Sequence, residues 1–221
     1  MLTMNKIFDR ALNELAYQLH QLSQRVNYFI YNRQFNRTEY SKFGDIPTWT
    51  KKRELETLYY MASKLPRGAY ALEVGSYLGA STCYIASGLS RIGGHLFCVD
   101  TWKNETMLEG KRDTFAEFLK NTQSLREHIT PIRKRSSELK DEDIRLPLHL
   151  VFIDGDHNYT GVKNDFERVA PWVAKDGIIA FHDSNVRQYE GVSRVIGEAL
   201  LTGEWKVSGA IESLLWLTPF C

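Results

Sequence analysis

The 221-residue sequence has few cysteines and no long apolar run, and each shortage excludes a class of protein. Its three cysteines, Cys83, Cys98 and Cys221, are an odd number without the spacing of metal ligands. We therefore expect buried or terminal thiols in a reducing compartment. No window approaches the eighteen apolar residues of a membrane span, and Asp9 and Glu14 interrupt the stretch where a signal peptide would be apolar. A cytoplasmic location is expected.

An excess of charge of either sign is also missing. The chain carries 28 Lys and Arg residues against 27 Asp and Glu residues, so no global field recruits nucleic acid or an anionic membrane. Internal repeats and low-complexity tracts are absent as well. The length suits one α/β domain with a sizeable core and a small N-terminal appendage.

The apolar pattern divides the chain into a helical appendage over 1–65 and an α/β domain over 66–221. Apolar residues at three- and four-residue intervals predict helices over 4–32 and 50–65. After residue 66, strands and helices alternate, which implies a parallel sheet. Strands are expected near 69–75, 95–100, 129–135, 148–154 and 177–182, helices near 80–91, 109–122, 159–173 and 191–202, and a closing strand pair near 205–208 and 214–219.

The rest of the chain is organised around a glycine turn at the end of the first of these strands. Gly75 allows a sharp turn, and Gly79 allows a ligand or the neighbouring strand to approach closely just before a helix N-terminus. Glu73 stands two residues before the first glycine, where a carboxylate would repel a pyrophosphate. The expected ligand is therefore a positively charged nucleoside rather than a dinucleotide, although an ordinary strand-to-helix turn is the alternative.

The segment 71–82 resembles the first motif of class I S-adenosylmethionine (SAM) methyltransferases. Tyr77 and Ser81 are especially similar to the catechol-type and caffeoyl-CoA-type O-methyltransferases. The resemblance implies a Rossmann-like, doubly wound, mostly parallel sheet of seven strands with an antiparallel C-terminal strand, preceded by N-terminal helices. It also implies that residues 66–221 bind SAM, with Glu73, Gly75 and Gly79 at the methionine end.

Two further positions are expected to bind the cofactor. Asp100 ends the second strand 21 residues after Gly79, where an acid accepts hydrogen bonds from both ribose hydroxyls. The alternative is a turn aspartate before Trp102, which would itself stack near the adenine, line the acceptor pocket or lie exposed on a loop. Ser136, after the third strand, matches the adenine contact of the superfamily and is also a good helix N-cap.

Ionisable residues gather at the ends of two neighbouring strands. Asp154, Asp156 and His157 follow one strand, and His182 and Asp183 follow the next. Adjacent parallel strands lie roughly 5 Å apart, so Asp154 and Asp183 can share one metal ion. A carboxylate or imidazole within reach of a hydroxyl can also remove its proton. For the first group alone, the alternative is a polar turn that caps the following helix.

This arrangement resembles the metal-dependent O-methyltransferases. The Asp-Gly-Asp-His-x-Tyr and Phe-His-Asp strings are closer still to bacterial macrocin-type and cephalosporin-associated O-methyltransferases. The resemblance implies that Asp154 and Asp183 bind a divalent cation with help from His182, that Asp154 also belongs to the cofactor site, and that Asp156 or His157 is the base. Ser184 replaces the catechol-type Asn and His182 replaces a second acid, so a metal-free site with a histidine base stays open.

The sequence thus predicts a SAM-dependent O-methyltransferase that acts on a small hydroxylated acceptor with a divalent cation, Mg²⁺ being the first choice. A metal-independent N-methyltransferase and a catalytically silent SAM-binding scaffold are the alternatives. The near-neutral charge disfavours a nucleic-acid substrate. The aromatic-rich N-terminal helix is compatible with a homodimer, and the loops carry no code for the acceptor.

Overall fold

The computed structural model describes residues 43–104 and 110–220 together with scattered positions between 15 and 33. Those scattered positions are helical, in agreement with the helix expected over 4–32. The rest of that helix, most of the stretch before residue 43, residues 105–109 and Cys221 lie outside the described residues. Exposed apolar side chains occur at described positions of the N-terminal helix, namely Leu15, Leu22, Val26 and Phe29.

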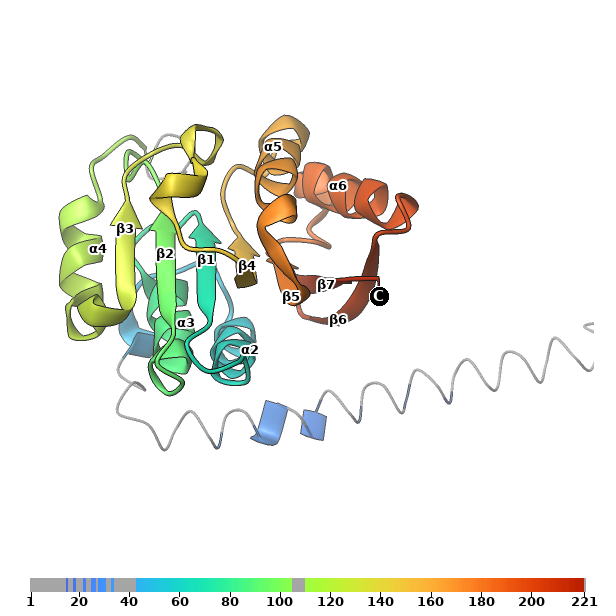
Figure 1. Ribbon diagram of the computed structural model, residues 1–221, viewed down its shortest axis with the longest axis horizontal. Coiled ribbons are helices and arrows are strands. Elements are labelled where there is room, and N and C mark those ends of the chain that lie inside the picture. The colour runs from blue at the N-terminus through green and yellow to red at the C-terminus, as the bar shows by residue number, and fades with distance from the viewer. Residues whose placement is uncertain are drawn as a thin grey trace, which may run out of the picture.

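One seven-stranded sheet forms the centre of the molecule, in the order β3-β2-β1-β4-β5-β7-β6 (Figure 1). The first five strands in this order are parallel, and β7 is antiparallel to both of its neighbours. The strands are β1 (Tyr70–Val74), β2 (His95–Val99), β3 (Ile129–Ile132), β4 (Leu148–Ile153), β5 (Val173–Phe181), β6 (Trp205–Ile211) and β7 (Leu214–Pro219). The predicted fold class is confirmed, and the parallel register brings the carboxyl ends of β1, β2, β4 and β5 to one edge.

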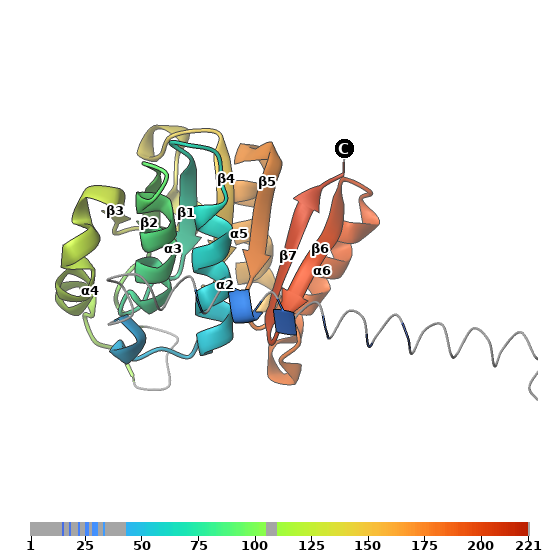
Figure 2. The same ribbon diagram turned by 90° about the horizontal axis from the view of Figure 1, so that it is seen from below.

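Helices cover both faces of the sheet (Figure 2). Those on one face are α2 (Lys52–Ser63), α3 (Ala80–Ser90) and α4 (Phe115–Thr122), and those on the other are α5 (Tyr159–Val169) and α6 (Glu190–Leu201). Successive residues of each strand alternate between two apolar cores. Ala71 packs with the α2–α3 side, for example, and Leu72 packs with the α5–α6 side. This double burial explains why the parallel strands are almost entirely apolar.

Most element boundaries agree with the sequence within a few residues, and the exceptions have local causes. The helix predicted over 159–173 ends at Val169 and continues only as a 3₁₀ turn, because Pro171 lacks the amide proton that an α-helix needs there. The helix predicted from residue 109 begins at Phe115 instead, where Asp113 Oδ1 accepts a hydrogen bond from the Phe115 amide at 3.0 Å.

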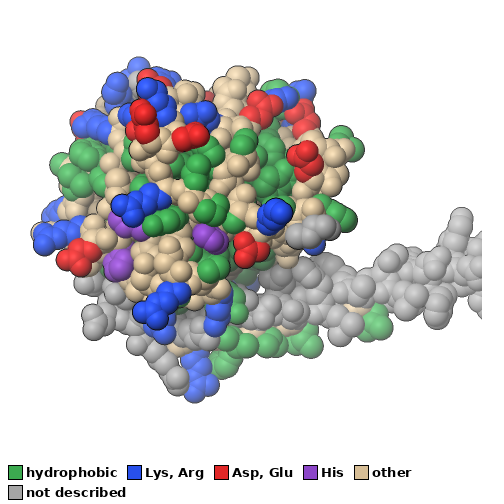
Figure 3. All heavy atoms as spheres, in the orientation of Figure 1, with side chains coloured by type: hydrophobic (Ala, Val, Ile, Leu, Met, Phe, Trp, Pro, Cys, Tyr) green, Lys and Arg blue, Asp and Glu red, His purple; other side chains and the backbone are tan. Residues whose placement is uncertain are grey.

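The surface agrees with the near-zero net charge. Acidic and basic side chains are interspersed on the face shown in Figure 3, without a broad region of one sign. Cys83 and Cys98 are buried, as expected for core thiols. None of the described helices combines the length and apolar character that crossing a bilayer requires.

Candidate active site

Gly75 is the point at which three strands of the sheet converge. Its φ of +85° is one that other residues rarely adopt, and a Cβ here would lie 2.2 Å from the Asp154 carbonyl oxygen. The Gly75 amide donates to Val99 O at 2.9 Å, and the Asp154 amide donates to Val74 O at 2.8 Å. The glycine therefore permits the close approach of β4 that brings the Asp154 segment beside the turn.

Gly79 is also required, but for a different neighbour from the one expected. It caps α3 with a φ of +89°, and a Cβ would lie 2.8 Å from Thr122 Cγ2 and 3.1 Å from Phe118 Cδ2. The close approach in this structure is made by α4 rather than by a strand, and contact between Gly79 and a ligand stays a prediction. Tyr77, between the two glycines, has a φ of +45°, so the turn is left-handed at a non-glycine residue too.

Glu73 braces the glycine turn from inside the protein. Its fully buried carboxylate accepts hydrogen bonds from Ser76 Oγ at 2.7 Å and from Thr82 Oγ1. Burial raises the pKa of Glu73 to about 7, although the hydroxyls of Ser81, Thr82 and Ser76 oppose the rise. Direct contact between this carboxylate and the cofactor stays a prediction.

Asp100 holds the same turn from the other side. Its Oδ2 accepts hydrogen bonds from the amides of Ser76 and Tyr77, both at 2.9 Å, and its Oδ1 accepts one from the Trp102 amide at 2.7 Å. The aspartate therefore has the turn-forming role that the sequence left as an alternative. Because a carboxylate oxygen can accept more than one hydrogen bond, the ribose role stays a prediction.

Trp102 lies in the core and not on the surface. It is 1% exposed, donates from Nε1 to Tyr77 O at 3.0 Å, and packs against Phe115 and Phe118 with ring centroids 4.8 and 4.7 Å away. Of the three possibilities for Trp102, the exposed loop position is excluded, because the loop after β2 folds back under the turn.

A cavity of about 450 Å³ opens between the ends of β1, β2 and β4. The predicted cofactor residues that line it are Gly75, Tyr77, Asp100, Ser136 and Asp154, and the predicted base Asp156 lines it as well. Glu73, Gly79 and Ser81 are not among its lining residues and instead support the turn. The volume is within the range of small-molecule sites.

Asp165 is a cavity residue that the sequence analysis missed. It comes from α5, is 3% exposed, and accepts a hydrogen bond from Ser136 Oγ on Oδ1. Burial raises the pKa of Asp165 to about 6. A signal for it exists in the sequence, because this acid falls three residues after Val162 and four before Val169, on the apolar face of its helix.

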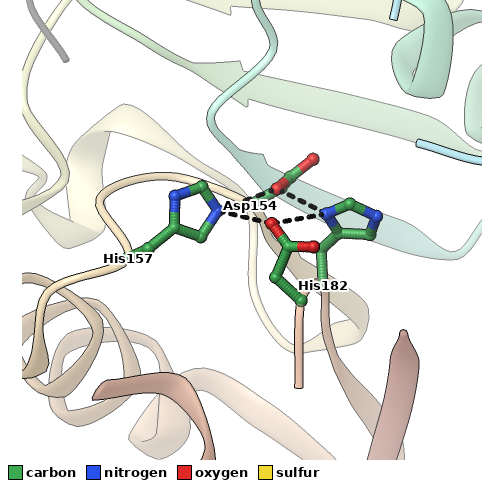
Figure 4. A group of neighbouring side chains, drawn as sticks. Asp154, His157 and His182 are labelled. Atoms are coloured by element: carbon green, nitrogen blue, oxygen red, sulfur yellow. Dashed lines mark ion pairs between the residues drawn. The ribbon is translucent and has the colours of Figure 1, made fainter. Parts of the chain in front are cut away.

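Next to this cavity, two aspartates and two histidines point toward one another (Figure 4). The cluster consists of Asp154, His157, His182 and Asp183, each of which offers one ligand atom within 4.8 Å of the others. His182 Nδ1 lies 3.0 Å from Asp154 Oδ1 and 3.4 Å from Asp183 Oδ2. His157 Nε2 lies 3.5 and 3.2 Å from the same two atoms. The structure thus brings together the predicted metal residues and one of the two predicted bases.

The backbone register of β4 and β5 explains why these side chains lie close together. Ile153 and Phe181 are register partners on β4 and β5, so the residues that follow them leave the sheet side by side. The His182 amide donates to Ile153 O at 3.0 Å, which extends the ladder by one residue. Asp183 then has a φ of +54°, a left-handed conformation that a non-glycine residue holds only when its surroundings impose it.

The four groups shift one another's protonation. Burial disfavours charge on both histidines, but Asp154 and Asp183 outweigh it and raise the pKa of His157 to about 9 and that of His182 to about 12. The histidines in turn lower the pKa of Asp154 and of Asp183 despite burial. Perturbed groups of this kind beside a cavity are typical of functional sites.

Asp156 lies outside the cluster. Its Oδ1 accepts a hydrogen bond from the Asn158 amide at 3.0 Å, and Asn158 Oδ1 in turn accepts one from the Gly161 amide at 2.9 Å to cap α5. The helix-capping turn that the sequence left as an alternative therefore describes Asp156 and Asn158. It does not describe His157, whose ring stacks on Tyr189 at 4.3 Å and faces the carboxylates.

The sequence matches a family model described as a methyltransferase domain over residues 72–184, slightly more than half of the chain. The chain belongs to this methyltransferase family. The matched segment runs from β1 to just past β5, so it contains the glycine turn, the cavity and all four residues of the cluster.

One curated relative is an uncharacterized protein of Sinorhizobium fredii, y4gI, which is 29% identical over 122 residues. The match covers 53% of this chain but only 13% of that protein, so the chain spans a small part of its relative's length.

Solved structures of methyltransferases share the fold. The SAH-bound methyltransferase PaMTH1 of Podospora anserina has a TM-score of 0.62 and 10% identity, with 100% of this chain and 99% of that chain covered. A candidate caffeoyl-CoA O-methyltransferase of Staphylococcus aureus has a TM-score of 0.61 and 16% identity, with 89% and 98% covered. CalS11, a TDP-rhamnose 3′-O-methyltransferase of calicheamicin biosynthesis, has a TM-score of 0.58 and 11% identity, with 86% and 92% covered. At these identities the likeness shows the fold alone, which is that of SAM-dependent methyltransferases.

Proposed function

We propose that this methyltransferase uses SAM to methylate a hydroxyl group of a small molecule, with a divalent cation held by Asp154, His182 and Asp183. The observation that carries the proposal is the cluster of two aspartates and two histidines beside the cavity. Asp154 belongs to both the cavity and the cluster, so a methyl donor in the cavity lies next to whatever the cluster binds.

The residues present fit a divalent cation. His157 Nε2 and His182 Nδ1 are buried, and within the described chain neither makes an aligned hydrogen bond, although carboxylate oxygens lie 3.0 to 3.5 Å away. The two nitrogens form ion pairs with Asp154 and Asp183 when protonated, and the same atoms become available as ligands when they lose their protons. Carboxylates suit Mg²⁺, and an imidazole ligand equally admits Mn²⁺ or Zn²⁺. A cation here would lower the pKa of an acceptor hydroxyl and orient it.

His157 is the better of the two predicted bases. Asp156 bonds its own turn, whereas the His157 ring is partly exposed and directs Nε2 into the cluster. His157 can take a proton only as a neutral ring, and its pKa of about 9 depends on Asp154 and Asp183, whose charge a bound cation would offset. In the proposed reaction the acceptor hydroxyl gives its proton to this neutral ring, and its oxygen forms a bond to the methyl carbon while the sulfonium carbon–sulfur bond breaks. The products are the methyl ether and S-adenosylhomocysteine. Positioning of the two reactants supplies much of the rate, because the sulfonium is already activated.

Calorimetric titration with SAM and with Mg²⁺, Mn²⁺ or Zn²⁺ tests this proposal on wild type and Asp183→Asn. We expect the variant to bind SAM as wild type does and to lose cation affinity by about 100-fold, since it loses a ligand charge outside the cavity lining. Asp176→Asn is the matched control, because Asp176 is an exposed acid on the same strand, β5. Its titrations should equal those of wild type.

Three outcomes would contradict the proposal, and two of them would support a named alternative. No binding of SAM by wild type would overturn the proposal. Full methyl transfer in a chelator would favour a metal-independent N-methyltransferase. SAM binding without turnover on vicinal diols, sugars or phenols, unchanged by Asp154→Ala, would favour a silent SAM-binding scaffold.

A further inference from the structure

A buried glutamate outside the family-matched segment contacts the far side of the cluster. Glu54 lies in the first turn of α2 and is 0% exposed. Its Oε2 accepts a hydrogen bond from His182 Nε2 at 3.1 Å and from the Lys51 amide at 2.7 Å. Its Oε1 accepts hydrogen bonds from the amide and the hydroxyl of Ser213, at 2.7 and 2.6 Å. Both oxygens of this carboxylate are therefore fully used.

Helix capping alone does not account for this carboxylate. A glutamate that caps its own helix needs only the contact to the Lys51 amide, and it makes that contact at the surface without being desolvated. Glu54 is buried instead, and burying a charge is costly unless it is well paired. Four donors offset this cost, because each oxygen of Glu54 accepts two hydrogen bonds from the Lys51 amide, His182 and Ser213.

The two nitrogens of His182 have different surroundings. Nε2 faces Glu54, an acceptor without a proton of its own, so Nε2 carries a hydrogen. Nδ1 faces Asp154 and Asp183, which favour a hydrogen on this nitrogen too as long as no cation is bound. A histidine that binds a cation is neutral, so its hydrogen would stay on Nε2 against Glu54 and Nδ1, the atom that points into the cluster, would offer its lone pair.

We propose that Glu54 is a positioning residue that fixes His182 with its hydrogen on Nε2 and holds Nδ1 toward the cation. A carboxylate that accepts from the second nitrogen of a metal-binding histidine fixes both the tautomer and the ring orientation, and removing it typically weakens metal binding 10- to 100-fold. This inference rests on the proposed cation site.

The same contact ties two flanking parts of the chain to the methyltransferase segment. Ser213 belongs to the β6–β7 turn, and its carbonyl oxygen accepts hydrogen bonds from the amide and hydroxyl of Ser184, at 2.9 and 2.8 Å. The turn thus supports both Glu54 and the residue that follows Asp183. Helix α2 and the C-terminal hairpin therefore complete the site from outside residues 72–184.

Cation titration of full-length Glu54→Gln, Glu54→Leu and Ser213→Ala, with Mn²⁺ as the probe, tests this role. Glutamine has one acceptor oxygen and cannot serve both His182 and Ser213, and leucine serves neither. We expect Mn²⁺ affinity to fall 10- to 100-fold in Glu54→Leu and by a similar or smaller factor in Glu54→Gln. Ser213→Ala keeps the contact between Glu54 and His182, so its Mn²⁺ affinity should change less than about threefold. SAM affinity reports that each variant is folded and should stay that of wild type.

Nitrogen-15 NMR of the His182 ring supplies a readout that a purely structural role would not change. With Mn²⁺ replaced by diamagnetic Zn²⁺, wild type should show a protonated Nε2 protected from exchange and an unprotonated Nδ1, and Glu54→Leu should lose that protection. Equal Mn²⁺ affinity in wild type and Glu54→Leu, or a hydrogen on Nδ1, would overturn the inference. If wild type binds SAM but no cation, the proposed cation site fails. In that case, an Nε2 proton that is protected from exchange in wild type but not in Glu54→Leu would show that Glu54 holds His182 even though no cation binds.

Discussion

Two sets of carboxylates lie at the same edge of one sheet, but they differ in the groups that they contact. Beside the cavity, Glu73 and Asp100 accept hydrogen bonds from hydroxyls and backbone amides of the glycine turn. At the ends of β4 and β5, Asp154 and Asp183 face imidazole nitrogens instead. Glu73 and Asp100 stabilise the glycine turn. Asp154 and Asp183 instead direct oxygen atoms, which could act as metal ligands, toward one another and the histidines.

Protonation follows the same division. Burial raises the pKa of Glu73 to about 7, but the two histidines lower the pKa of Asp154, which is half-buried. The comparison teaches that an acid at the end of a parallel strand has no fixed meaning. Its partners decide whether it braces a loop or remains charged for a ligand, and those partners come from other elements.

The largest effect is expected where the two regions touch, at Gly75. In Gly75→Ala the new Cβ would lie 2.2 Å from the Asp154 carbonyl oxygen, and the residue would keep a φ of +85°. We expect a loss of about 4 kcal/mol in the free energy of unfolding, measured by urea denaturation, because backbone atoms cannot move aside cheaply.

The matched control is Gly203→Ala, which has a φ of +75° but open space around its Cβ position. It should lose only about 1 kcal/mol, the cost of the left-handed backbone alone. Equal losses in the two variants would show that β1 and β4 do not meet as closely as the comparison requires.

The second-largest expected effect is a change in the free energy of unfolding with pH, caused by the titration of Glu73. The pKa of Glu73 is raised from 4.5 to about 7, so the folded protein binds this proton more tightly than the unfolded chain. Stability that depends on Glu73 is therefore full below about pH 4.5 and falls as the pH rises toward 7, by about 3 kcal/mol in total. Glu73→Gln removes this titration.

Chemical denaturation of wild type and Glu73→Gln between pH 5 and pH 8 measures this loss of unfolding free energy with rising pH. The difference in unfolding free energy should change in favour of the variant as the pH rises, whatever its value at pH 5. A constant difference would mean that folding does not raise the pKa of Glu73.

Local patterns in the sequence were sufficient for one part of this comparison. The strand periodicity and the positions of Asp154 and Asp183 after two apolar runs predict that the two aspartates meet, because parallel register makes the strand ends neighbours. The sharp turn after β1 was predictable from Gly75 itself, but the neighbours that approach the two glycines, Asp154 and α4, are distant in sequence.

Partners that are distant in sequence were not predictable. Glu54 and His182 are 128 residues apart, and no spacing rule connects a helix's first turn to the end of a strand. Within the sequence, Glu54 has no distinguishing feature beyond its place near the start of a predicted helix. The environment of Trp102 stayed open for a related reason, because its burial depends on Phe118 of a later helix. In both cases tertiary packing, and not local propensity, decides the environment.

The smallest effect concerns Ser136, the residue that joins the cavity to Asp165. Its hydroxyl donates to the Asp165 carboxylate and so opposes the rise that burial causes in the pKa of Asp165, to about 6. Ser136→Ala should cost about 1 kcal/mol of unfolding free energy at pH 8, where Asp165 is ionised, and less at pH 5, where it is protonated. Denaturation at the two pH values checks this, with Ser137→Ala as the neighbouring control.

A loss in Ser136→Ala that is the same at both pH values would show that the hydroxyl does not favour the ionised carboxylate. Asp165 would then differ from Glu73, whose pKa is lowered by hydroxyl donors against the effect of burial.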